Sequence, residues 1–126
     1  MVQVNTSAEE SKDGCEPVEC KDLVRHVVSQ CANLHFCGLM TIGKLGDTTS
    51  ACFDMLAGIR DDLLKDAELA KVCPPIDAFE LSMGMSGDYE LAVKSGSTNV
   101  RVGSTIFGAR QPKQSSSPTQ EPAKVN

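Results

Sequence analysis

Short apolar runs alternate with amphipathic stretches over the first 110 residues, in the lengths typical of a strand followed by a helix. Continuous or alternating apolar residues predict strands at 2–5, 34–42, 78–82 and 99–102. Apolar residues at helical spacing predict helices at 17–31, from a cap at Thr48 or Thr49 to about 67, and at 88–94. Pro74-Pro75 is expected to end the second helix and Gly96 the third.

This order of elements, with one more helical turn at 104–107, predicts a parallel α/β sheet with right-handed crossovers. The 126 residues are about half the length of a (β/α)₈ barrel, which commonly binds phosphate with the loops after its last two strands and a short extra helix. We therefore expect residues 1–110 to form parallel βα units that correspond to the second half, strands 5–8, of a TIM-type barrel. Residues 111–126 are rich in Ser, Pro and Gln and are expected to be a disordered tail.

Two turns of small residues, 82–88 and 103–105, are each placed where a strand passes into a helix. Backbone N–H groups are unpaired at such points and attract anions, and parallel strands bring their carboxyl ends to one edge of the sheet. Glycines allow a ligand to approach the backbone, and hydroxyls can donate to phosphate oxygens. The residues concerned are Gly84, Gly87, Gly103, Ser82, Ser86, Ser104 and Thr105. Either turn alone is more simply explained by the preference of Gly and Ser for turns, but the occurrence of two such turns favours a phosphate-bearing ligand.

Charge and composition bear on the binding partners, the location in the cell and the role of the cysteines. A net charge of −5 disfavours nucleic acid and anionic membranes as partners, and residues 1–14 contain neither the basic nor the apolar segment of a secretory signal. We expect a cytoplasmic protein, without distinguishing an organelle. The six cysteines form no C-x-x-C pair and are predicted to be small apolar residues in a reducing compartment. A zinc site of Cys15, Cys20, His26 and His35 is the alternative, but its spacing matches no common pattern.

Four segments, VQVNTSAEESKDG at 2–14, GLMTIG at 38–43, ELSMGMSGDYELAV at 80–93 and GSTNVRVGSTIFGAR at 96–110, resemble the pyridoxal phosphate homeostasis protein family. The resemblance implies a barrel similar to that of bacterial alanine racemase, with pyridoxal 5′-phosphate held as a Schiff base. It implies that the phosphate is bound by Ser82, Ser86, Gly103 and Ser104, and that Arg101 lies beside the cofactor. The alternative for Arg101 is a strand arginine paired with a carboxylate.

The resemblance implies a non-catalytic carrier that buffers pyridoxal phosphate inside the cell and supplies it to apo-enzymes. An amino-acid racemase is the enzymatic alternative, but it needs a second acid/base, typically a tyrosine from another domain, and the one tyrosine here is Tyr89. An inactive fragment is the third reading. The family lysine lies on the first barrel strand, so we expect it to lie outside this chain. Lys12 and Lys44 follow strands but lie in polar loops that favour a solvated side chain.

Four strands taken from a closed barrel would have two unpaired edges. Six apolar side chains would then be expected to face a missing half of the barrel: Val2, Val4, Leu39, Leu81, Val100 and Val102. Exposed apolar surface beside open edges promotes association. The sequence therefore predicts either a homodimer that restores eight strands or an aggregation-prone monomer.

Overall fold

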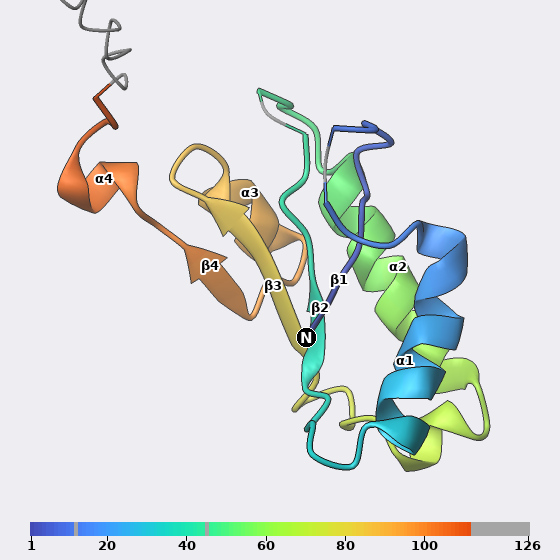
Figure 1. The fold of residues 1–126 in the computed structure, drawn as a ribbon. Helices are drawn as coiled ribbons and strands as arrows, with labels where there is room; N and C mark the ends of the chain where they lie inside the picture. Colours follow the sequence, from blue (N-terminus) through green and yellow to red (C-terminus); the bar gives the residue numbers. More distant parts are fainter. Residues whose placement is uncertain (12, 45, 112–126) are drawn as a thin grey trace, which may run out of the picture.

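The computed structural model describes residues 1–11, 13–44 and 46–111 (Figure 1). Its elements in chain order are β1 (Val2–Gln3), η1 (Pro17–Glu19), α1 (Cys20–Gln30), β2 (Gly38–Met40), α2 (Ala51–Lys65), η2 (Leu69–Lys71), β3 (Glu80–Met85), α3 (Tyr89–Lys94), β4 (Asn99–Arg101) and α4 (Ser104–Phe107). The predicted alternation of strands and helices is confirmed. The tail predicted to be disordered, 111–126, lies outside the described residues apart from Gln111.

The four strands form one parallel sheet in which neighbours in sequence are neighbours in space, in the order β1-β2-β3-β4. Val2 pairs with Leu39, and Leu39 pairs with Leu81. The pairing of β3 with β4 shifts register between Ser82 and Met85. All four strands point the same way, so the loops that follow them meet at one end of the sheet.

One face of the sheet is covered by helices, and Figure 1 shows α1 and α2 together beside β1 and β2. The side chains buried there form a continuous core: Val2, Val4, Cys20, Val24, Phe36, Leu39, Phe53, Leu56, Leu63, Leu69, Cys73, Phe79, Leu81, Met83 and Ala92. The prediction that Val2, Val4, Leu39 and Leu81 face a missing barrel half was wrong, because these side chains pack against the helices.

The opposite face carries a different set of side chains. Gln3, Met40, Ser82 and Asn99 lie side by side there through the strand register. Three of these four residues are polar, and the fourth is Met40. Val100, on the edge strand β4, is 38% exposed and does not belong to the core.

Several predicted boundaries need correction. Strand β2 occupies three residues of the predicted 34–42, and Leu34 is in a turn that closes on Cys31. Helix α2 begins after Ser50, because Asp47 accepts hydrogen bonds from the Thr49 backbone and hydroxyl at 2.8 Å and thereby holds the predicted cap in the loop. Helix α2 already ends at Lys65, before the two prolines. Gly96, with φ of +92°, follows α3 as predicted.

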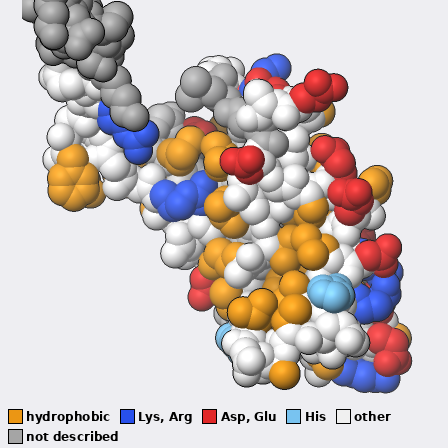
Figure 2. All heavy atoms as spheres, in the orientation of Figure 1, with side chains coloured by type: hydrophobic (Ala, Val, Ile, Leu, Met, Phe, Trp, Pro, Cys, Tyr) orange, Lys and Arg blue, Asp and Glu red, His pale blue; other side chains and the backbone are white. Residues whose placement is uncertain are grey.

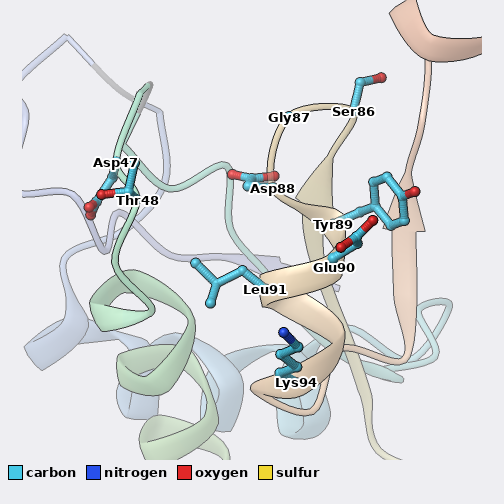
Figure 3. Close-up of a pocket in the computed structure, with 9 residues that line it drawn as sticks. All are labelled: Asp47, Thr48, Ser86, Gly87, Asp88, Tyr89, Glu90, Leu91 and Lys94. Carbon is cyan, nitrogen blue, oxygen red and sulfur yellow. The ribbon is translucent and has the colours of Figure 1, made fainter.

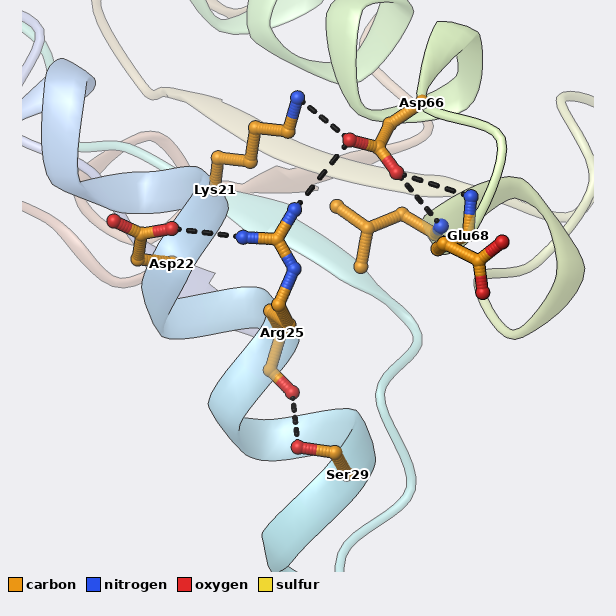
Figure 4. Close-up of polar contacts among 7 residues, drawn as sticks. Lys21, Asp22, Arg25, Ser29, Asp66 and Glu68 are labelled. Carbon is orange, nitrogen blue, oxygen red and sulfur yellow. Dashed lines mark hydrogen bonds and ion pairs between the residues drawn. The ribbon is translucent and has the colours of Figure 1, made fainter.

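Asp66 connects the end of α2 to α1 (Figure 4). Its Oδ2 accepts from Lys21 Nζ at 2.6 Å and from Arg25 Nη2 at 3.4 Å. Its Oδ1 accepts the backbone N–H groups of Glu68 and Leu69, both at 3.1 Å, and so begins η2. The hydrogen bond from Lys21, followed by that from the Leu69 backbone, lowers the pKa of Asp66 from 3.8 to about 2.

We expect Asp66→Asn to lower the melting temperature at pH 7, because these contacts favour the ionised carboxylate. The pKa is lower in the folded state, so the stabilisation is present above about pH 4 and is lost as the pH falls towards 2. Melting curves should show a steeper fall between these values for the wild type than for the variant. Asp22→Asn is the matched control, because Asp22 is 84% exposed and, among the described residues, forms an ion pair only with Arg25. Equal acid sensitivity in wild type and Asp66→Asn would contradict the assignment.

Charged side chains gather over the side of the molecule where α1 and α2 lie, and apolar side chains are exposed over part of the strands (Figure 2). The exposed large apolar residues also include Ile106 and Phe107 of α4. Among the described residues, none of the helices combines the length and the apolar character needed to cross a membrane.

Candidate functional site

The first predicted turn is shorter than expected. Strand β3 continues to Met85, so Ser82 and Gly84 are strand residues and only 86–88 form the turn. The reason is tertiary: β3 pairs with strands on both sides, and its Met83 is buried in the core. Glycine is nevertheless required at 84, because φ is +95° and a Cβ atom would lie 2.6 Å from that of Ala92 in α3.

The turn after β3 and the start of α4, which the sequence predicted to lie at the same edge of the sheet, are in direct contact. Ser86 Oγ accepts the backbone N–H of Gly103 at 3.0 Å and that of Thr105 at 3.3 Å. Two backbone donors from the second turn are therefore directed at one oxygen atom of the first. An anionic oxygen can take the same pair of hydrogen bonds.

A cavity of about 580 Å³ opens beside this contact. We call it the Arg101–Arg110 cavity, and its lining residues are Met85, Ser86, Gly87, Arg101, Gly103, Ser104, Phe107, Gly108 and Arg110. Both charged residues in this lining are arginines, in a chain whose net charge is −5. The cavity therefore has the electrostatic character of an anion site.

Four of the five predicted site residues, Ser86, Arg101, Gly103 and Ser104, line this cavity. The fifth, Ser82, lies behind Arg101 and contacts its guanidinium. The sequence prediction missed Arg110, although the residue ends the last family-like segment, because an arginine beyond the final helical turn has no spacing that assigns it to the site. It also missed Phe107, which supplies an apolar wall.

Arg101 is fixed by hydrogen bonds to Ser82 of β3 and to Thr41, the residue that follows β2. Its Nη1 donates to Ser82 O at 3.0 Å and to Ser82 Oγ at 2.7 Å, and its Nη2 donates to Thr41 O at 2.8 Å. The alternative that Arg101 pairs with a carboxylate is not seen among the described residues. The positive charge is consequently available to the cavity.

A second cavity of about 480 Å³ lies between the loop before α2 and the start of α3 (Figure 3). Two of its three carboxylates serve local structure: Asp47 holds Thr49, and Asp88 Oδ1 accepts the backbone N–H of Met85 at 2.6 Å, whereas Glu90 is the third. Tyr89 also lines this cavity, with its ring pointing away from Asp47 (Figure 3). Tyr89 does not belong to the lining of the Arg101–Arg110 cavity.

The remaining candidates are placed as follows. Lys44 is exposed, as a solvated loop lysine would be, and Lys12 lies outside the described residues.

Cys20, Cys52 and Cys73 are buried free thiols, whereas the other three cysteines are partly exposed. Burial raises the pKa of the Cys20 thiol to about 12. No group of three or more metal-ligating side chains is brought together in the part of the chain that the structure describes.

Comparison with known proteins identifies clear relatives by sequence. The chain is 46% identical to the pyridoxal phosphate homeostasis protein of Homo sapiens over 129 aligned positions, which cover 99% of this chain and 45% of the relative. It is 42% identical to the protein of the same name from Vibrio cholerae over 113 positions, which cover 87% of this chain and 44% of the relative. The chain thus spans about half the length of the curated relatives it matches. No protein-family model matches it.

Two solved structures are similar to the fold. An unknown protein from Bifidobacterium adolescentis matches with a TM-score of 0.70 and 40% identity over 85% of this chain and 42% of that one. PipY of Synechococcus elongatus, solved with PLP bound, matches with a TM-score of 0.63 and 31% identity over 84% of this chain and 49% of that one. The family resemblance predicted from the four segments is therefore confirmed.

Proposed function

We propose that this chain, which belongs by sequence to the pyridoxal phosphate homeostasis protein family, binds pyridoxal 5′-phosphate through the Arg101–Arg110 cavity. The observation that carries the proposal is the convergence of two backbone N–H groups on Ser86 Oγ at the wall of a cavity lined by two arginines. Backbone donors and guanidinium groups are the partners that a phosphate dianion requires. The residues present therefore fit the phosphate end of the cofactor.

Each lining residue has a distinct role in this proposal. The hydroxyls of Ser86 and Ser104 would contact the phosphate oxygens, and a phosphate oxygen that takes the place of Ser86 Oγ would accept the Gly103 and Thr105 N–H groups. Arg101 would supply positive charge from the strand side, and Arg110 would supply it from beyond α4. Phe107 and Met85 would contact the apolar part of the cofactor.

Pyridoxal phosphate, when bound, supplies an aldehyde that reacts with amines. The described lining contains no carboxylate, histidine or tyrosine that could move a proton at the cofactor. This composition supports a non-catalytic role in which the protein buffers pyridoxal phosphate in the cytoplasm and passes it to apo-enzymes. The family name printed for the relatives, which refers to homeostasis, supports the same role.

For the fold, we propose that β1 to β4 correspond to strands 5–8 of a TIM-type barrel. The parallel order of the strands, the one-sided helix cover and the 49% coverage of PipY support this assignment. In a barrel the face that carries Gln3, Met40, Ser82 and Asn99 would be the interior. A homodimer in which two copies supply four strands each is the corresponding proposal for oligomeric state.

The purified chain is expected to bind pyridoxal phosphate, and inorganic phosphate should compete with it in calorimetric titrations. Pyridoxal, which lacks the phosphate, should bind more weakly. Ser104→Ala should weaken binding of the phosphorylated form by about 1–3 kcal/mol, the range for a hydrogen bond to a charged group. Ser29→Ala is the matched control, because its hydroxyl bonds to Arg25 O on α1. Equal affinities for the phosphorylated and unphosphorylated forms would overturn the proposal.

A further inference from the structure

Ser82 occupies a position from which it reaches Arg101 and not the cavity. It lies in the middle of β3, is 4% exposed, and is paired in register with Met40 and Asn99. Its backbone oxygen accepts the N–H of Thr41 at 3.1 Å, so the residue is held on the β2 side by the sheet itself. The Arg101–Arg110 cavity has Arg101 in its lining but not Ser82.

The hydrogen bonds of the Ser82 hydroxyl leave it no proton for a phosphate. A hydroxyl carries one hydrogen, and a guanidinium can donate but not accept. Ser82 Oγ therefore accepts from Arg101 Nη1 at 2.7 Å and donates to Asn99 Oδ1 at 3.1 Å. Because phosphate oxygens without a proton can only accept, a direct bond from Ser82 to phosphate would require the bond to Asn99 to be broken.

Arg101, in contrast, keeps donors that form no hydrogen bond to the described part of the chain. Three of the five guanidinium hydrogens are used on Ser82 O, Ser82 Oγ and Thr41 O, which leaves the Nε hydrogen and one on Nη2. The guanidinium is planar and rigid, so fixing one edge also fixes the direction of the other donors. The orientation of Arg101 towards the cavity thus depends on the groups behind it.

We infer that Ser82 is a positioning residue: its hydroxyl, itself oriented by Asn99, holds the Arg101 guanidinium in the direction needed for an anionic ligand in the cavity. The expected effect of Ser82 on ligand affinity rests on the proposed function. The family resemblance implies that Ser82 contacts the phosphate, whereas in this inference Ser82 contacts Arg101, and Arg101 contacts the ligand. Ser86 and Ser104 keep the direct contacts, and the Gly103 N–H makes one when a phosphate oxygen replaces Ser86 Oγ.

A double-mutant cycle tests the inference with pyridoxal phosphate as the probe. Ser82→Ala should weaken binding about tenfold, and Ser82→Thr, which keeps the hydroxyl, should restore most of the affinity. In an Arg101→Gln background, Ser82→Ala should have no further effect, because the group it positions is gone. An equal loss in both backgrounds would show that Ser82 acts independently of Arg101 and would overturn the inference.

A measurement without ligand separates this inference from the proposed function. Rotation of the Arg101 guanidinium, followed by NMR of its side-chain nitrogens in the full chain, should be slow in the wild type and in Ser82→Thr and fast in Ser82→Ala. Ser97→Ala is the matched control, because the Ser97 hydroxyl, in the loop that leads into β4, bonds to Met83 O of β3 at 2.7 Å. It should lower stability without freeing Arg101. Unchanged rotation in Ser82→Ala would overturn the inference even if pyridoxal phosphate did not bind.

Discussion

Replacing Gly38 by alanine is expected to separate β2 from β3 and to leave the chain without a stable sheet. Gly38 has φ of +157° and pairs with Glu80, and a Cβ atom would lie 1.9 Å from Glu80 O. Neither backbone can move aside without losing pairs in the middle of the sheet. Steric overlap and an unfavourable φ together should lower the free energy of unfolding by about 4 kcal/mol or more.

Denaturant titration monitored by circular dichroism would measure the effect. Gly58→Ala is the matched control, because nothing lies within 4 Å of a Cβ atom there and the residue is inside α2. It should raise stability by about 0.5–1 kcal/mol, since alanine favours a helix over glycine. A Gly38→Ala protein as stable as the wild type would show that β2 and β3 are not paired in this register.

Arg101→Gln should give the largest loss of binding among single substitutions in the cavity. Glutamine removes the charge and cannot reach Thr41 O, Ser82 and the cavity together. We expect the affinity for pyridoxal phosphate to fall by about 30- to 150-fold, which corresponds to about 2–3 kcal/mol for lost bonds to a charged group. Arg101→Lys should recover little, because an ammonium lacks the planar fork.

Titrations at two salt concentrations would separate specific contacts from general charge. Lys71→Gln changes the net charge equally but lies on η2, where Lys71 pairs with the exposed Glu68. It should leave the affinity within about twofold of the wild type. Equal losses in the two variants would mean that overall charge, and not Arg101, controls binding.

The sequence predicted the order of the elements well, because the apolar runs in 2–5, 78–82 and 99–102 are short and clearly bounded. It placed Ser82 in a turn for a local reason: Ser82, Met83 and Gly84 have the composition of a turn. Hydrogen bonds to two neighbouring strands override that local preference, and such pairing is invisible in one sequence. Val2, Val4, Leu39 and Leu81 were assigned to the wrong face, because periodicity shows that a face is buried but not what covers it.

Part of the lining of the Arg101–Arg110 cavity was also predicted from the sequence. Glycines and hydroxyls identified both turns, and Ser86, Gly103 and Ser104 do line one cavity. Arg110 was missed because its contribution depends on how the chain turns after α4. The different roles of Ser82 and Ser86 could not be predicted from the sequence, because they depend on the hydrogen bonds that each hydroxyl makes in the folded chain.

The loop after β1 closes back on the strand that precedes it. Gln3 O accepts the N–H of Cys15 and Cys15 O accepts the N–H of Asn5, each at 2.9 Å. Glycine at 14 permits this approach, because a Cβ atom would lie 2.9 Å from Asn5 N. The outer edge of β1 is therefore partly capped by its own chain, whereas β4 has no strand on its outer side among the described residues.

This asymmetry restricts how copies of the chain can join. A dimer that closes a barrel must pair β4 of one copy with β1 of the other, and must first break the two bonds to Cys15. Two β4 edges, in contrast, can meet directly about a twofold axis, and that contact uses up both open edges. Edge-to-edge pairing between β4 strands would therefore stop at two copies, and further growth would need the partly capped edge of β1.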